Sequence, residues 1–142
     1  MKRSHPHLLE KIKLVPLAEQ AISVVTLAEL MYGLKLSGSP AKARAVFDDF
    51  IRYPAVLDWN RAAGEHYADI RADLKRRGET IGANDLMIAA HARSLGATLI
   101  TNNMREFVRV SGLVVKLGRA LTWAAWNVRS RLFASTCAIR CR

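Results

Sequence analysis

Residues 82–103 read GANDLMIAAHARSLGATLITNN, and this stretch decides the fold. From residue 85 to residue 95 it is almost entirely apolar or small, which predicts a helix buried against a sheet. We expect Asn84 to cap this helix and Gly96 to end it. Residues 97–101 then form a short strand that enters the same sheet.

Asp85 lies in the first turn of this predicted helix, where a carboxylate faces a partial positive charge. Positions 88, 89 and 92 share its face and are Ile, Ala and Ala, so its own helix supplies no cation. We interpret Asp85 as the leading candidate for a metal or catalytic ligand. The alternative is an aspartate that only suits the helix dipole.

Composition indicates one globular domain with, at most, an appendage. The chain has 142 residues, of which 51% are hydrophobic and 24% charged. No apolar run is long enough for a membrane span, and the N-terminus lacks the apolar core of a signal peptide. Cys137 and Cys141 lie at the extreme C-terminus, so no disulfide framework supports the fold. We therefore expect a cytoplasmic protein that does not act at a membrane.

The net charge of +10 divides the chain into two segments. Residues 1–117 hold 17 Lys and Arg against all 12 acidic residues, whereas residues 118–142 hold five Arg and no acid. A basic body favours nucleic acid as a partner. The run 75–77 (KRR) suits the negative end of a helix, with contact to RNA phosphates as the alternative. We predict a domain over residues 1–117 and a basic, loosely packed or disordered tail over residues 118–142.

Strands and helices alternate along residues 1–117, which predicts an α/β fold with a mainly parallel central sheet flanked by helices. Thr26 and Glu29 have the spacing of a capping box that opens the first strong helix. Strands are expected at residues 21–25, 55–59, 97–101 and 113–117, and the other helices are expected to start near Ser39 and Asn60.

Three polar groups are expected at the carboxyl edge of that sheet. Glu29 follows the strand at 21–25, Asp85 begins the buried helix, and the strand at 97–101 leads to Asn103. Carboxylates that converge repel each other unless a cation lies between them. Oxygen ligands without clustered Cys or His favour Mg²⁺ or Mn²⁺ over zinc. The alternative for Glu29 is the capping box alone.

The segments ISVVTLAELMYG, IRADLKRRGETIGANDLMIAAHARSLGATLITNNMREF and VSGLVV resemble the VapC toxins of bacterial toxin–antitoxin pairs, which are PIN-domain ribonucleases. The resemblance covers about residues 1–117. It implies an endoribonuclease that depends on Mg²⁺ or Mn²⁺, is often directed at tRNA, forms a homodimer and is silenced by a cognate antitoxin. By the family's motifs, Glu29 and Asp85 match the second and third acidic metal-binding positions. Asn103 falls at the fourth, where close relatives carry asparagine.

One departure from the family pattern, at the N-terminus, shapes the predictions. Family members open with a strand ending in Asp-Thr-Asn that supplies the first metal-binding aspartate, and this chain has no such motif. We therefore predict a truncated PIN-like fold that lacks its first, central strand and holds its metal weakly. The alternative function is a non-catalytic module that binds antitoxin or dimerises with an intact paralogue. A third hypothesis makes the basic tail a membrane or nucleic-acid adaptor.

Overall fold

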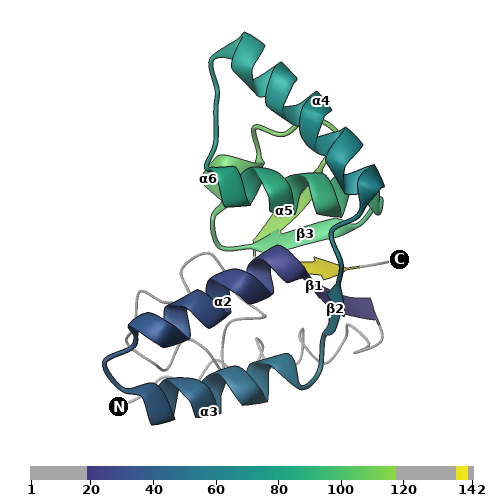
Figure 1. The fold of residues 1–142 in the computed structure, drawn as a ribbon. Coiled ribbons are helices and arrows are strands. Elements are labelled where there is room, and N and C mark those ends of the chain that lie inside the picture. The colour runs from purple at the N-terminus through teal and green to yellow at the C-terminus, as the bar shows by residue number, and fades with distance from the viewer. Residues whose placement is uncertain (1–18, 118–136, 141–142) are drawn as a thin grey trace, which may run out of the picture.

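The computed structural model describes residues 19–117 and 137–140, and Figure 1 shows how their helices and strands are arranged. The fold is α/β, as predicted. In chain order the elements are β1 (Gln20–Ser23), α2 (Val24–Leu36), α3 (Pro40–Ile51), β2 (Ala55–Leu57), α4 (Arg61–Arg77), α5 (Ala83–Ser94), β3 (Thr98–Thr101), α6 (Met104–Phe107), β4 (Val114–Leu117) and β5 (Cys137–Arg140).

The described strands form one sheet in the order β2-β1-β5-β3-β4. β1 pairs with β2 in parallel, and β3 pairs with β4 in parallel, as the alternating sequence pattern predicts. β5 is antiparallel to both of its neighbours. The sheet is therefore two parallel pairs joined by one antiparallel strand.

The central strand β5 corrects the prediction for the tail. Residues 137–140 were expected to be loosely packed, but they pair with β1 and β3, and Ile139 is 1% exposed in the core. Ile139 is in register with both Ala21 and Leu99, so the two parallel pairs meet across it. The expected gap at the centre of the sheet is thus filled. The rest of the predicted tail, residues 118–136 and 141–142, lies outside the described residues.

Helix α2 begins earlier than the capping box predicts. Its N-cap is Ser23, whose Oγ accepts a hydrogen bond from the backbone N–H of Val25 at 3.1 Å. Thr26 is therefore inside the helix and buried, and within the described part of the chain its Oγ1 has no hydrogen-bond partner. A capping box opened by Thr26 would place Glu29 in the first turn, but one extra turn precedes it in the structure.

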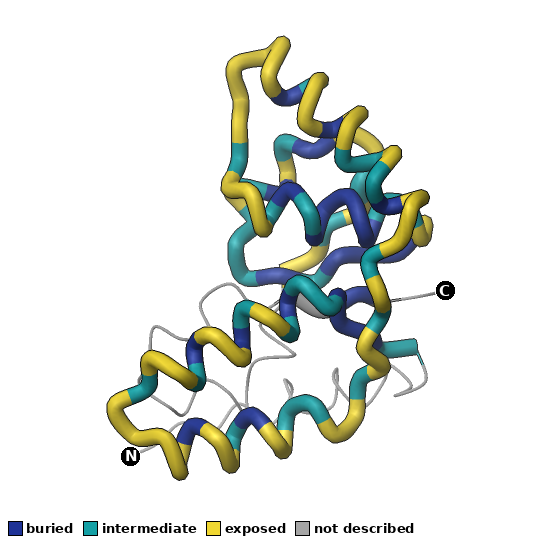
Figure 2. The backbone as a smooth tube through the Cα atoms, in the orientation of Figure 1, coloured by how far each residue is buried: buried dark blue, intermediate teal, exposed yellow. Residues whose placement is uncertain are grey.

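The principal core lies where α5 meets the sheet. Leu86, Ile88 and the alanines that follow are buried, so α5 is the darkest helix in Figure 2. Helix α4 packs on α5 through Ile70 and Leu74 and ends at Gly78, whose φ of 66° is left-handed. The pair α2 and α3 lies at the other end of the molecule, around a small second cluster of Leu30 and Phe47.

Candidate active site

Three junctions of the fold bring the predicted site residues together. Glu29 stands in the second turn of α2, which follows β1 directly. Asp85 lies in the first turn of α5, and Asn103 is the N-cap residue of α6, just after β3. Because β1 and β3 point the same way in the sheet, the elements that follow them start at one edge.

Two asparagines hold the carboxylates at this edge. Asn103 Nδ2 donates to Asp85 Oδ2 at 3.1 Å, and Asn84 Nδ2 donates to Glu29 Oε1 at 3.0 Å. Asn84 was expected to cap α5, but Gly82 is the N-cap residue and makes no side-chain cap bond. The side chain of Asn84 therefore reaches across to α2, which places Glu29 beside the residue that precedes Asp85.

The electrostatic environment raises the pKa of Asp85 from its usual 3.8 to about 6. Burial is the largest cause, because the charged carboxylate loses part of its hydration. The negative charges of Glu29 and Glu106 act in the same direction, and the hydrogen bond from Asn103 opposes them. The floor beneath Asp85 is apolar as predicted, since Ile88, Ala89 and Ala92 are fully buried.

Glu106 is a site residue that the sequence reasoning missed. It lies in the first turn of α6, three residues after Asn103, and its charge reaches Asp85. The sequence gives little sign of this residue's role, because the helix Met104–Phe107 is too short to be recognised from its pattern of apolar residues. Glu106 thus brings a third carboxylate to the edge that carries Asp85 and Glu29.

A buried polar pair joins the two helices that carry the acids. Ser23, the cap of α2, lies with its Oγ 2.9 Å from Nδ1 of His91 on α5, and both residues are buried. Burial lowers the pKa of His91, with the charge of Asp58 acting in the opposite direction. This contact fixes the start of α2 against α5.

The donor set suits a hard divalent cation in type. Among the residues that the structure describes, no three His, Cys, Asp or Glu side chains are arranged to hold an ion by themselves. Mg²⁺ commonly keeps several waters and binds through one or two carboxylates together with substrate phosphates. Glu29 and Asp85 match that pattern, and their mutual repulsion would be relieved by a cation.

Known proteins resemble this chain over most of its length. A model of the PIN domain matches residues 3–113. The chain belongs to the PIN-domain family. The tRNA(fMet)-specific endonuclease VapC of Shigella flexneri is 48% identical over 95 residues, which are 67% of this chain and 72% of that relative. The corresponding protein of Salmonella typhimurium is 40% identical over 116 residues, or 82% and 87% of the two chains.

Solved structures agree with the sequence relatives. This PIN domain matches the DNA-bound VapBC structure from Salmonella typhimurium with a TM-score of 0.74 at 39% identity, over 82% of this chain and 87% of that one. The VapBC2 structure from Rickettsia felis, bound to a DNA fragment from its promoter, gives a TM-score of 0.66 at 37% identity, over 68% and 73%. This PIN domain is therefore of the VapC ribonuclease type, a group that generally depends on divalent metal ions.

Proposed function

We propose that this chain is the toxin of a toxin–antitoxin pair, an endoribonuclease that uses Mg²⁺ or Mn²⁺ to cut RNA. Glu29 and Asp85 hold the ion, and Asn103 completes the catalytic set. The relative from Shigella flexneri is named for tRNA(fMet), and the body of the present chain is basic, so we propose tRNA as the substrate class.

One observation carries this proposal: Asp85 is a partly buried carboxylate whose pKa is raised to about 6 by burial and by two neighbouring acids. A raised pKa at a convergent acidic edge is typical of a functional site. Without a cation, burial and the neighbouring acids make ionisation of Asp85 less favourable than in water. A divalent ion would offset that cost, because it is attracted to the charged form.

Each residue of the proposed site has a separate role. When bound, a divalent ion supplies an activated water and stabilises charge on phosphate oxygens. Asn103 orients the carboxylate of Asp85 through its side-chain amide, and Asn84 does the same for Glu29. The negative charge of Glu106 holds a cation near this edge. The apolar floor under Asp85 excludes water from that side.

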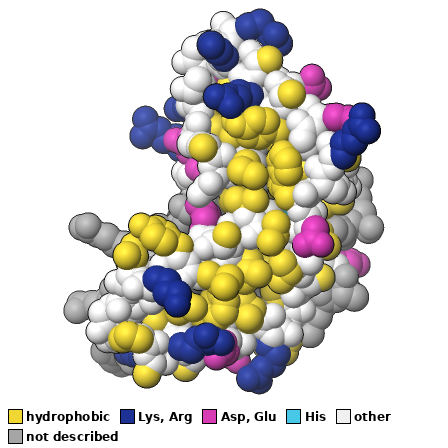
Figure 3. All heavy atoms as spheres, viewed as in Figure 1, with side chains coloured by type: hydrophobic (Ala, Val, Ile, Leu, Met, Phe, Trp, Pro, Cys, Tyr) yellow, Lys and Arg dark blue, Asp and Glu magenta, His cyan; other side chains and the backbone are white. Residues whose placement is uncertain are grey.

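The surface supports a protein partner as well. Met31, Tyr32 and Leu36 of α2 are 51%, 66% and 63% exposed. Figure 3 shows hydrophobic side chains gathered over α2 and α3 and where α4 meets α5. We propose that an apolar segment of a cognate antitoxin covers α2, since the matched Salmonella and Rickettsia structures are VapBC assemblies. We further propose a homodimer that acts in the cytoplasm. No described helix is long and apolar enough to cross a membrane.

A cleavage assay tests the catalytic proposal. A tRNA transcript is incubated with the full chain in Mg²⁺, in Mn²⁺ and in EDTA. We expect cleavage only with metal, and a loss of about 10²–10⁴-fold in Asp85→Asn and Glu29→Gln, the size of effect of a lost acid–base or ligand group. Asp49→Asn, an exposed acid on α3, is the matched control and should cleave normally.

Three results would decide against parts of this scheme. Undiminished cleavage by Asp85→Asn removes its catalytic role. Binding of an antitoxin by a chain that never cleaves RNA favours the non-catalytic alternative. The antitoxin from the Salmonella complex is a practical probe for that measurement, with Tyr32→Glu expected to weaken binding. Tyr53→Glu, at a tyrosine that is also exposed but lies beyond the end of α3, is the control.

A further inference from the structure

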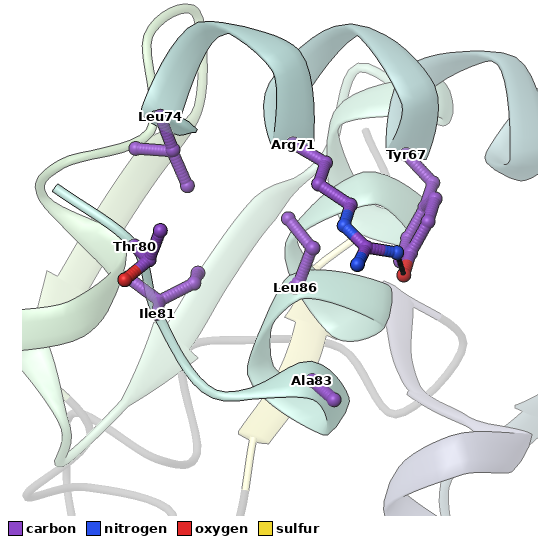
Figure 4. Close-up of a pocket in the computed structure, with 7 residues that line it drawn as sticks. All are labelled: Tyr67, Arg71, Leu74, Thr80, Ile81, Ala83 and Leu86. Carbon is purple, nitrogen blue, oxygen red and sulfur yellow. Dashed lines mark hydrogen bonds between the residues drawn. The ribbon is translucent and has the colours of Figure 1, made fainter. Parts of the chain in front are cut away.

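A cavity of about 230 Å³ opens between α4 and the start of α5, outside the carboxylate site (Figure 4). It is lined from three directions: α4, the loop between the two helices, and the first turn of α5. The lining residues are Tyr67, Arg71, Leu74, Thr80, Ile81, Ala83 and Leu86. Ala83 and Leu86 flank Asn84 and Asp85 in the sequence, so the cavity begins within one residue of the acid.

One wall of the cavity is an aromatic ring held in place before any ligand arrives. Trp59 Nε1 donates to the carbonyl of Met87 on α5 at 3.1 Å. The Trp59 ring then meets Tyr67 edge to face, with centroids 6.1 Å apart and planes at 81°. Leu74 and Leu86 are buried on the inner side and give the cavity an apolar floor. A rigid aromatic wall over an apolar floor suits a flat ring.

The mouth of the cavity carries a positive charge without an acidic partner. Arg71 is exposed, donates from Nη1 to the hydroxyl of Tyr67 at 2.9 Å, and places its guanidinium 5.8 Å from the Tyr67 ring centroid. Figure 4 shows it reaching across to that ring. In the described part of the chain Arg61, Arg77 and Arg93 each pair with a carboxylate, whereas Arg71 pairs with none. Its charge is therefore available to a phosphate.

The volume of the cavity limits the kind of ligand that it can bind. Pockets that take a whole drug-sized ligand are about 300–1,000 Å³, so this smaller cavity suits a single ring system. A cavity with an aromatic wall and an unpaired guanidinium, next to the proposed metal-binding carboxylate of Asp85, matches one nucleotide of an RNA strand. Single-stranded nucleic acids are commonly held by this combination of base stacking and basic side chains.

We propose that this cavity binds one unpaired nucleobase of the RNA substrate, which stacks on Tyr67 while Arg71 contacts an adjacent phosphate. This subsite rests on the proposed ribonuclease function and adds to it a reason for selecting unpaired RNA. It places the recognised nucleotide close to the phosphodiester that faces Asp85. Tyr67 and Arg71 thus determine specificity and are not part of the ion site.

Steady-state kinetics on a short single-stranded oligoribonucleotide test this assignment. We expect Tyr67→Ala and Arg71→Ala to raise KM by roughly 5- to 150-fold with little change in kcat, the range found when one base loses its stacking partner. Arg61→Ala removes the same charge from the same helix, outside the cavity, and should leave KM within about twofold. Thr80→Trp, which fills the cavity from the loop without removing a core side chain, should act like Tyr67→Ala.

Abasic substrates provide the decisive comparison. Replacing one nucleotide near the cut by an abasic residue should reproduce the loss seen in Tyr67→Ala, and should cause no further loss in that variant. The subsite is overturned if the cavity variants keep the wild-type KM, or if variant and abasic losses multiply as independent effects.

The failure of the ribonuclease itself would look different. A wild-type chain that cleaves no RNA with Mg²⁺ or Mn²⁺ contradicts the proposed function. Fluorescence anisotropy of the same labelled oligonucleotide then measures binding to the same variants. If affinity falls only in the cavity variants and with the abasic strand, the subsite is retained. If the wild type and all variants bind both strands equally well, the subsite is overturned.

Discussion

Replacing Asp85 by asparagine should stabilise the metal-free protein at neutral pH while destroying its activity. The substitution keeps the shape of the side chain, and the new amide oxygen can still accept the hydrogen bond from Asn103. It removes a negative charge that burial and two neighbouring acids disfavour. A metal-binding side chain that destabilises the folded state when the metal is absent is expected at a functional site.

The structure sets the magnitude. A pKa that rises from 3.8 to about 6 corresponds to roughly 3 kcal/mol between the two protonation states. Asp85 is only partly buried, so solvent screening reduces this to about 1–2 kcal/mol. The variant also loses a favourable charge at the start of α5, which is worth about 0.3–1 kcal/mol. We expect a net gain of about 1 kcal/mol in the free energy of unfolding near pH 7.5.

The sign depends on pH. Because the pKa of Asp85 is higher in the folded state, the folded chain binds more protons between about pH 4 and pH 6. The stability of the wild type therefore falls as the pH rises through this window, whereas the variant lacks that loss. The two proteins should be nearly equal below about pH 4 and should separate progressively up to about pH 7.

Urea denaturation in EDTA, followed by circular dichroism at several pH values, measures this difference. Asp49→Asn, which neutralises an exposed acid on α3, should show no such separation. Added Mg²⁺ should stabilise the wild type by mass action and leave Asp85→Asn unchanged. A variant that is no more stable than the wild type at neutral pH, in the absence of metal, would refute the electrostatic reasoning.

Two further predictions concern the surroundings of the site. Ser23→Ala removes the cap of α2 and the partner of a buried histidine, so it should lower the free energy of unfolding by about 2–4 kcal/mol in urea titrations. Ser39→Ala, at the N-cap of α3, should cost well under 1 kcal/mol because that side chain makes no cap bond; equal losses would contradict the assignment. Glu29→Gln and Glu106→Gln should each lower the pKa of Asp85, and the effect of Glu29→Gln should be the larger. NMR titration of the Asp85 carboxyl measures this pKa. An unchanged pKa of Asp85 in both variants would show that these acids do not act on the site.

Much of the site could be read from local pattern. Asp85 is recognisable because it begins a helix whose other residues are mostly apolar or small. Asn103 is recognisable because a run of residues typical of a β-strand ends just before it. Both signals lie within a few residues in sequence. Glu106 was missed because its helix has four residues, too few to show a period. The roles of these residues stay predictions until the variants are measured.

Caps were predicted less well, because several residues near a helix start can serve. Ser23 and Thr26 both have suitable hydroxyls, and the strand β1 ends early enough for Ser23 to be used. Asn84 has a suitable amide, but its partner is Glu29, 55 residues away in the chain. The backbone N–H groups of α5 and the distant carboxylate of Glu29 compete for the side chain of Asn84, and the residues around Asn84 in the sequence do not show which of them it binds.

The sequence by itself determined the order of the helices and strands other than α6 and β5, the buried helix α5 and the acid at its start, because each depends on neighbours within about one or two turns. Only the tertiary structure decided that β5 enters the centre of the sheet and that Tyr67, Arg71 and Leu86 enclose a cavity beside Asp85. Strand pairing and cavity lining join residues far apart in the chain, and their free energy depends on what the whole fold leaves exposed to water.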